Sequence, residues 1–267
     1  MGAASQLPSA LERFDRILAL AAGRRFALFL DYDGTLTPIV DRPELAVLPD
    51  ETRRILGSLA RRVPVAVISG RSLDDVKRLV GLAGIYYAGS HGFEIEAPSG
   101  ERLDADLAGQ YLPALDCAEA ALRRRLRDVP NVLIERKRYT IAVHYRLVDP
   151  ARLDEVRAAV SEAAAEQPEL RRAEGKMVFE LQPALEWNKG KAVERLAGEL
   201  GLKRESDFPL FIGDDRTDED AFRALAGWGA GILVRDADVD TAAQFALNSP
   251  FEVAEFLRRL GAGLPRD

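Results

Sequence analysis

The sequence predicts an α/β protein with a parallel-sheet core and a smaller α+β unit inserted into it. Two observations support this: short apolar runs ending in polar loops alternate with helical patterns, and residues 105–183 interrupt that alternation. Strands that alternate with helices indicate a parallel sheet covered on both faces. The 267 residues are enough to bury a large core as one or two domains.

The first core strand is expected at residues 26–30, FALFL, whose unbroken apolar character is typical of a strand buried on both faces. Asp31 and Asp33 follow directly, at the strand end where open α/β sheets bind ligands. Side chains at i and i+2 of an extended segment point the same way, so both carboxylates can converge on one spot if a cation or shared proton relieves their repulsion. An EF-hand is excluded because Leu36 and Arg42 hold its glycine and glutamate positions. A plain turn remains an alternative.

The later core segments also alternate between expected strands and expected helices. Further strands are expected, in chain order, at residues 63–68, 84–88, 209–212 and 231–234. A helical pattern over 73–80 follows the first of these. Near the end, the segment 249–252, SPFE, combines a capping box with proline at the first helical position, which predicts the start of a final helix.

The inserted unit has the pattern of a helix followed by a hairpin, twice. Its helices are expected at residues 107–127 and 150–167, and its strands at 131–135, 139–147, 170–173 and 176–182. Apolar and polar side chains alternate along the second and fourth strands, so the helices should cover the apolar face. The other face would carry His144, Arg146, Lys176 and Glu180, either as an ordinary solvated face or as a binding surface.

Composition excludes several classes of partner. A net charge of −6 and a pI near 5.3 argue against nucleic acid or an anionic membrane. The single cysteine, Cys117, permits no intrachain disulfide and fits a reducing compartment, and two histidines argue against a Cys/His zinc site. The first residues lack a signal-peptide core, and no apolar run reaches membrane-spanning length. We therefore expect a soluble, cytoplasmic protein.

A second acidic cluster follows the strand at 209–212. Its members are Asp214, Asp215, Asp218, Glu219 and Asp220. Acidic residues in a first helical turn favour the helix dipole, which explains Glu219 and Asp220. Asp214 instead leaves a strand end, as Asp31 does. Carboxylates at two strand ends predict a site for Mg²⁺, which binds one or two carboxylates together with substrate phosphate and water.

Two further polar residues stand where a phosphate could bind. Ser69 offers a hydroxyl and backbone amides at a helix start, and Lys189 opens another helix. Taken singly, Ser69 is an N-cap and Lys189 a surface charge. A Walker loop around Lys191 is excluded, because the required glycine before Gly190 is missing and alanine follows the lysine.

Four motifs together resemble those of the haloacid dehalogenase superfamily of phosphatases: DYDGT, SGR after a strand, the lysine of WNKG, and GDDRTDED. More narrowly, AGSHGFEI, IERKRYTIAVHYR and GKMVFELQP are similar to the trehalose-6-phosphate phosphatase family. The resemblance spans about residues 24–260. It implies a Rossmann-like core of haloacid dehalogenase type, residues 1–104 and 184–267, with an inserted α+β cap at 105–183. Asn188 departs from the family, where aspartate often precedes the lysine, and we expect no effect on catalysis.

The resemblance also implies a magnesium-dependent mechanism. Asp31 would attack phosphorus to give an aspartyl-phosphate, and Asp33 would act as acid and then as base. Mg²⁺ would be held by the Asp31 carboxylate, the Asp33 carbonyl and Asp214. The remaining implied roles are phosphate binding by Ser69, Gly70 and Lys189, and support of magnesium waters and Lys189 by Asp215 and Asp218.

By the same resemblance, the insert is a mobile cap whose polar face closes on the sugar. The residues that match sugar-binding positions are Glu135, Lys137, His144, Lys176 and Glu180, and weaker substrate-binding candidates are Arg71 and His91. A functional association with a trehalose-6-phosphate synthase is a further expectation.

Three other functions remain open at this point. One is a related capped phosphatase for sucrose phosphate or another phosphosugar. Another is a non-catalytic regulatory domain of a trehalose synthase complex, against which the intact Asp31, Asp33, Lys189 and Asp214 argue. The third is a phospho-acceptor signalling domain, which would need neither a second aspartate beside the nucleophile nor a sugar-sized cap.

Overall fold

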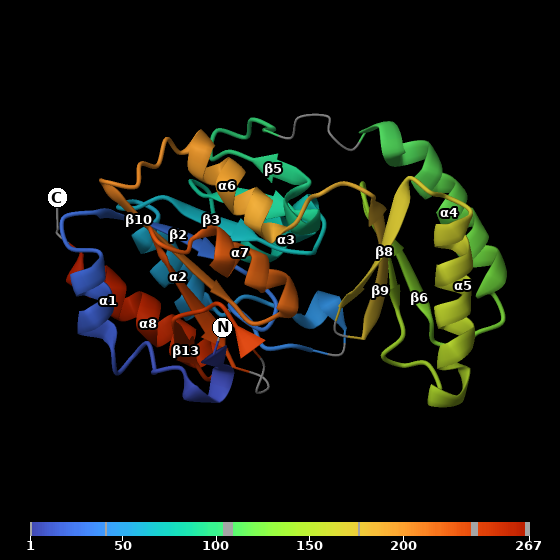
Figure 1. Cartoon of the computed structure of the whole chain (residues 1–267), viewed down its shortest axis with the longest axis horizontal. Helices are drawn as coiled ribbons and strands as arrows, with labels where there is room; N and C mark the ends of the chain where they lie inside the picture. The colour runs from blue at the N-terminus through green and yellow to red at the C-terminus, as the bar shows by residue number, and fades with distance from the viewer. Residues whose placement is uncertain (1, 41, 104–108, 176, 236–239, 265–267) are drawn as a thin grey trace. The chain divides into compact units, whose positions relative to one another are not determined.

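The computed structural model describes residues 2–40, 42–103, 109–175, 177–235 and 240–264. The chain divides into two compact units, one formed by Met1–Leu103 and Trp187–Asp267 and the other by Asp104–Glu186 (Figure 1). The first unit contains the helices α1 (Phe14–Leu20), α2 (Asp50–Leu59), α3 (Leu73–Val80), α6 (Lys189–Glu199), α7 (Glu219–Ala224) and α8 (Pro250–Gly263).

A seven-stranded sheet forms the centre of the first unit, in the order β13-β11-β10-β2-β3-β4-β5. Its strands are β2 (Arg25–Leu30), β3 (Val65–Ile68), β4 (Tyr86–Gly89), β5 (Glu94–Glu96), β10 (Asp207–Gly213), β11 (Ala230–Val234) and β13 (Phe245–Leu247). Neighbouring strands are parallel except at the β4–β5 edge. A small antiparallel ribbon joins β1 (Gly2–Ala3) to β12 (Asp240–Thr241). The expected α/β fold with a mainly parallel sheet is confirmed.

Helices cover both faces of this sheet, as the unbroken apolar strands require. In β2, Leu28 and Leu30 pack with α1, α2, α3 and α8, whereas Phe29 packs on the other face with α6 and α7. All three side chains are essentially inaccessible to water. Burying side chains of this size stabilises the fold by roughly 1.5–3 kcal/mol each. This burial on both faces holds the central strands in place, and the loops at their carboxyl ends begin from those strands.

The final helix begins where its capping sequence predicts. The Ser249 hydroxyl accepts a hydrogen bond from the Glu252 amide at 3.3 Å, and the Glu252 carboxylate accepts one from the Asn248 amide at 2.8 Å. Pro250 is the first helical residue of α8. The first bond satisfies an amide that the helix itself leaves without a partner, and the second ties Glu252 to the residue before the N-cap.

The second unit is an antiparallel four-stranded sheet in the order β6-β7-β9-β8, with two helices on one face (Figure 1). Its elements are α4 (Leu112–Arg125), β6 (Leu133–Arg136), β7 (Ile141–His144), α5 (Leu153–Ala165), β8 (Leu170–Gly175) and β9 (Val178–Pro183). Val143 and Phe179 point toward the helices and pack with Leu115 and Val160. None of the described helices has both the length and the apolar character needed to cross a bilayer.

The expected strand at 139–147 is longer than the observed one. β7 ends at His144, and Leu147, which the alternation places on the apolar face, is 57% exposed. Met177, which directly precedes β9, has φ +62° and is also exposed. The ladder between β7 and β9 ends at the pair of His144 and Val178, although the Tyr145 amide still donates to the Met177 carbonyl at 3.2 Å. Tyr145 packs against the apolar cluster as the alternation predicts, whereas Leu147 does not.

Candidate active site

The site lies at the carboxyl ends of β2, β3 and β10, the three central strands of the first unit. Leu30 is in register with Val67 on one side and Ile212 on the other. The Asp31 amide extends the ladder by donating to the Ile212 carbonyl at 2.9 Å. Parallel strands end at the same edge, so the residues that follow them come together.

Gly34 allows Asp214 to approach the loop after β2. Its φ is +81°, and a Cβ built on it would lie 2.1 Å from Asp214 Oδ2. Only glycine has both the backbone freedom and the space for this contact. The neighbouring Thr35 hydroxyl, fully buried, lies 3.3 Å from Asp214 Oδ1. Thr35 was not among the expected site residues, and its place within the DYDGT motif is the only signal for it.

Lys189 joins two of the acidic residues. It is the first residue of α6, and its Nζ donates to Asp31 Oδ1 at 2.7 Å and to Asp218 Oδ1 at 2.6 Å. Burial alone would lower the pKa of the ammonium, but the carboxylates of Asp218 and Asp31 raise it well above its ordinary value. Lys189 therefore stays positively charged at any physiological pH. It is not the surface charge that its position alone permits.

Asn188 begins α6 as its N-cap and accepts a hydrogen bond from the Lys191 amide at 2.9 Å. Asparagine and aspartate cap helices about equally well. Asn188 therefore caps the helix as an aspartate would.

Asp218 organises the loop after β10. Its Oδ2 accepts the amides of Asp214 at 3.0 Å and Asp215 at 2.9 Å, while Oδ1 accepts from Lys189. A Cβ on Gly213 would lie 2.4 Å from Asp218 Cγ, so glycine is needed at the strand end. Asp218 is completely buried, and these bonds compensate for the burial of its charge.

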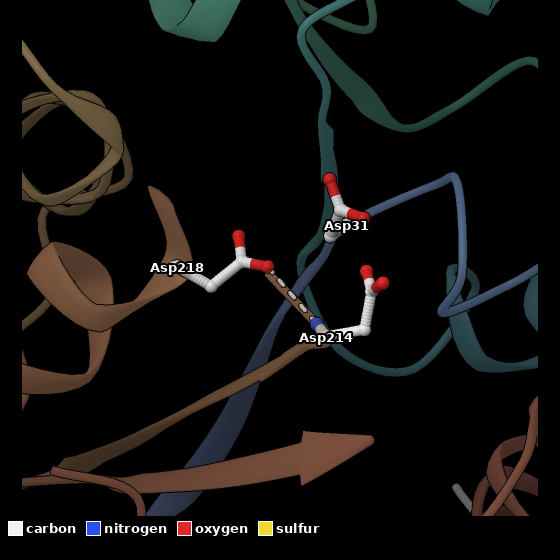
Figure 2. Close-up of side chains that lie close together, drawn as sticks. All are labelled: Asp31, Asp214 and Asp218. Atoms are coloured by element: carbon white, nitrogen blue, oxygen red, sulfur yellow. Dashed lines mark hydrogen bonds between the residues drawn. The ribbon is translucent and has the colours of Figure 1, made fainter. Parts of the chain in front are cut away.

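Asp31, Asp214 and Asp218 form an acidic cluster able to hold a metal ion. One carboxylate oxygen from each lies within 4.8 Å of the others, and the three side chains surround a common space (Figure 2). Burial raises the pKa of Asp31 well above its ordinary range, against the opposing charge of Lys189, and Asp218 and Asp214 raise it further. A cation would favour the ionised cluster. Since both oxygens of Asp218 already accept hydrogen bonds, Asp31 and Asp214 are the better-suited ligands.

The Asp33 carboxylate is not part of that cluster. Arg71 binds it through two hydrogen bonds, from Nε to Oδ2 at 2.7 Å and from Nη2 to Oδ1 at 2.6 Å. Arg71 Nη1 also donates to Asp75 Oδ2 at 2.8 Å. The two aspartates after β2 therefore have different cationic partners, Lys189 for Asp31 and Arg71 for Asp33. The convergence of both carboxylates on one spot, expected from their spacing, is not observed, because Arg71 binds Asp33 while Lys189 binds Asp31.

Ser69 and Gly70 form the loop after β3. The Ser69 amide donates to the Ala88 carbonyl at 2.9 Å, and its Oγ accepts the Arg71 amide at 3.1 Å. A Cβ on Gly70 would lie 2.8 Å from the His91 ring, and the His91 amide donates to the Ser69 carbonyl at 2.9 Å. His91 thus supports this loop.

In the second unit, polar side chains gather on the sheet face opposite the helices. Glu135, Ala142 and Glu180 are in register across three neighbouring strands. His144 Nε2 lies 2.9 Å from Glu135 Oε2, and Lys137 Nζ lies 3.5 Å from Glu180 Oε1. Four of the five residues expected to bind sugar thus form two contacting pairs. The fifth, Lys176, lies outside the described residues.

Known proteins resemble this chain over nearly its whole length. Residues 29–250 match the family model described as trehalose-phosphatase. A probable trehalose-phosphate phosphatase D of Arabidopsis thaliana is 41% identical, over 96% of this chain and 72% of that protein. A probable trehalose-phosphate phosphatase 4 of Oryza sativa subsp. japonica is 42% identical, over 95% and 70%. The structure of the C-terminal domain of C. albicans trehalose-6-phosphate phosphatase aligns with a TM-score of 0.81 at 27% identity, covering 97% of this chain and 99% of that one.

Proposed function

Because the chain belongs to the trehalose-phosphatase family, we propose that it hydrolyses trehalose 6-phosphate to trehalose and phosphate through an aspartyl-phosphate on Asp31. The observation that carries the assignment to particular residues is the buried chain of contacts Asp31–Lys189–Asp218 beside Asp214. An ordinary surface ion pair would have no reason to be buried against a third carboxylate. A site for a phosphate and a cation explains that arrangement.

In the first step, an Asp31 carboxylate oxygen attacks phosphorus, and the bond between phosphorus and the sugar oxygen breaks. Lys189 holds the other Asp31 oxygen and so orients the attacking one. Asp33 gives a proton to the departing sugar oxygen. Ser69, Gly70 and Lys189 bind the remaining phosphoryl oxygens, Ser69 through its hydroxyl and Gly70 through its backbone amide.

In the second step, water attacks the aspartyl-phosphate and Asp33 takes the water's proton, which restores both aspartates. Mg²⁺, held by Asp31, the Asp33 carbonyl and Asp214, would neutralise charge on the phosphoryl group. Asp218 keeps Lys189 and the loop of Asp214 and Asp215 in place. Asp31 and Asp214 are assigned as the carboxylate ligands because both oxygens of Asp218 already accept hydrogen bonds.

We assign sugar recognition to the polar sheet face of the second unit. A disaccharide presents many hydroxyls, which both donate and accept hydrogen bonds. The pairs Glu135–His144 and Lys137–Glu180 supply charged acceptors and donors for them. A sugar that leaves such groups without partners is rejected. Association with a trehalose-6-phosphate synthase, which would supply the substrate, stays a prediction.

The test is phosphate release from a panel of trehalose, sucrose, glucose and mannose 6-phosphates, with magnesium and with a chelator. We expect trehalose 6-phosphate to give the highest kcat/KM and the chelator to abolish turnover. A preference for sucrose phosphate would retain the mechanism and overturn the substrate. Full turnover in chelator would overturn the magnesium-dependent mechanism.

A further inference from the structure

Arg71 links several parts of the active site at once. Its Nε and Nη2 bind the two oxygens of Asp33, and its Nη1 binds Asp75 in the first turn of α3. The guanidinium carbon lies 5.4 Å from the centre of the fully buried Tyr32 ring. The Arg71 amide also donates to Ser69 Oγ. One residue therefore contacts the acid–base carboxylate, the phosphate-binding hydroxyl and a helix of the core.

This environment determines where the guanidinium can lie. The Arg71 side chain is only 9% exposed, against 40% for Asp33. A planar fork that donates two parallel hydrogen bonds fixes the direction of a carboxylate, which a single point charge does not. Asp75 accepts a hydrogen bond from the third nitrogen of the same guanidinium, Nη1, and also accepts one from Arg78. The more exposed carboxylate is thus oriented by the more buried arginine.

We infer that Arg71 is a positioning residue that holds the Asp33 carboxylate away from the acidic cluster of Asp31, Asp214 and Asp218 and in the orientation needed for proton transfer. Without it, the carboxylate two residues from Asp31 would be available to a cation at that cluster instead of to the leaving oxygen. Asp75 acts through Arg71. The inference rests on the proposed function, because it assigns proton transfer to Asp33.

Two other roles for Arg71 give different kinetics. An arginine that contacts the substrate contributes to binding, so its loss raises KM. An arginine that only stabilises the fold lowers the rate for every substrate equally as the folded fraction falls. A positioning residue lowers kcat mainly for substrates whose leaving group needs a proton. The dependence of rate on leaving group therefore separates the three roles.

The experiment measures kcat and KM for a series of aryl phosphates of increasing leaving-group pKa, together with trehalose 6-phosphate, in magnesium. The variants are Arg71→Met, Arg71→Lys, Asp75→Asn and, for comparison, Asp33→Asn. Arg258→Met is the matched control, because Arg258 forms the same kind of exposed i,i+3 pair with an acidic residue, Glu255 on α8, and not with Asp75. Thermal unfolding of each variant reports its folded fraction. If Arg71→Met does not fold, Arg71→Lys and Asp75→Asn provide the test.

We expect Arg71→Met to lose about 10²-fold or more in kcat for poor leaving groups, with less than about threefold change in KM and a much smaller loss for nitrophenyl phosphate. The way in which kcat of Arg71→Met depends on leaving-group pKa should approach that of Asp33→Asn. Arg71→Lys and Asp75→Asn should show the same pattern to a smaller extent, and Arg258→Met should match the wild type.

For Arg71→Met, an equal loss of kcat for all substrates, or a rise in KM without a loss of kcat, would overturn the inference. A wild type that hydrolyses aryl phosphates but not trehalose 6-phosphate would instead overturn the proposed substrate. The aryl series would still test Arg71 in that case, so the two failures are distinguishable.

Discussion

Lys189 and Asp31 are 158 residues apart in the sequence, yet Lys189 Nζ lies 2.7 Å from Asp31 Oδ1, and both side chains are buried. The same ammonium lies 2.6 Å from Asp218. A buried cation between two buried anions is stabilising only as a set, because loss of one member leaves the others charged and without compensation.

Lys189→Met should therefore reduce both stability and activity. Because Asp31 and Asp218 lose their buried cationic partner, we expect unfolding in chelator to become easier by about 3–5 kcal/mol. Phosphate release should fall to background. The double variant Lys189→Met/Asp218→Asn removes one of the two anions, so it should recover part of the stability and none of the activity. Wild-type turnover in Lys189→Met would exclude the assigned phosphate-binding role.

Gly34→Ala should weaken metal binding. The new Cβ would lie 2.1 Å from Asp214 Oδ2, so the Asp214 carboxylate must move. We expect magnesium affinity, measured by calorimetry, to fall about 10–100-fold. Gly84→Ala is the matched control, because Gly84 also has positive φ, +80°, but no atom within 4 Å of the added methyl. Equal affinities in the two variants would show that Asp214 is not a ligand.

Asp207 should make stability depend on pH at the opposite end of β10. Burial raises the pKa of Asp207, but hydrogen bonds from the Lys203 amide, Arg25 and Ser206 lower it by more than burial raises it. The net pKa is therefore below its ordinary value. Its contribution is present above the unfolded-state pKa, about 4, and is lost as pH falls through the folded-state pKa. Asp207→Asn should therefore be about 1–3 kcal/mol less stable at pH 7. Denaturant unfolding should show this difference shrinking steadily below pH 4, and a difference that is constant with pH would contradict the assignment.

Glu180→Ala should reduce sugar recognition without unfolding the second unit. Glu180 lies on the polar face, so no packing against α4 or α5 is lost, and the cost to stability is that of its contact with Lys137. Each sugar hydroxyl left without its partner costs roughly 1–3 kcal/mol. The ratio of kcat/KM for trehalose 6-phosphate to that for nitrophenyl phosphate should fall. Glu174→Ala is the control, since Glu174 pairs with Phe179 in the register and lies on the other face. A ratio unchanged in Glu180→Ala would remove this face from sugar recognition.

The parts of the fold that follow from local pattern were predictable. The apolar run before Asp31 fixed β2 to within one residue, and the capping box at Ser249 located the start of α8. That the residues after β2, β3 and β10 come together was predictable, because parallel strands end at one edge of a sheet. The end of β7 was not, because alternation continues in the sequence to Leu147 where pairing with the neighbouring strand has already stopped.

The partners of each charge could not be predicted in the same way. Sequence placed Asp33 beside Asp31 but gave no means of knowing that Arg71 would bind one and Lys189 the other. The contact of Asp75 with Arg71 has only an i, i+4 spacing as its signal, and that spacing is common on helices. Such pairings depend on loop conformations, which the positive φ of Gly34 and the tight packing at Gly70 determine.

The central claim is that Asp31 carries the phosphoryl group, and Asp31→Asn tests it most directly. The amide has nearly the same shape as the carboxyl group, so the thermal unfolding of the variant should confirm that it folds. In saturating magnesium, phosphate release from trehalose 6-phosphate is measured for the wild type and for Asp31→Asn. The account predicts turnover by the wild type and none above background by the variant. Turnover by a folded Asp31→Asn within about tenfold of the wild type would contradict it, because covalent catalysis cannot survive the loss of its nucleophile.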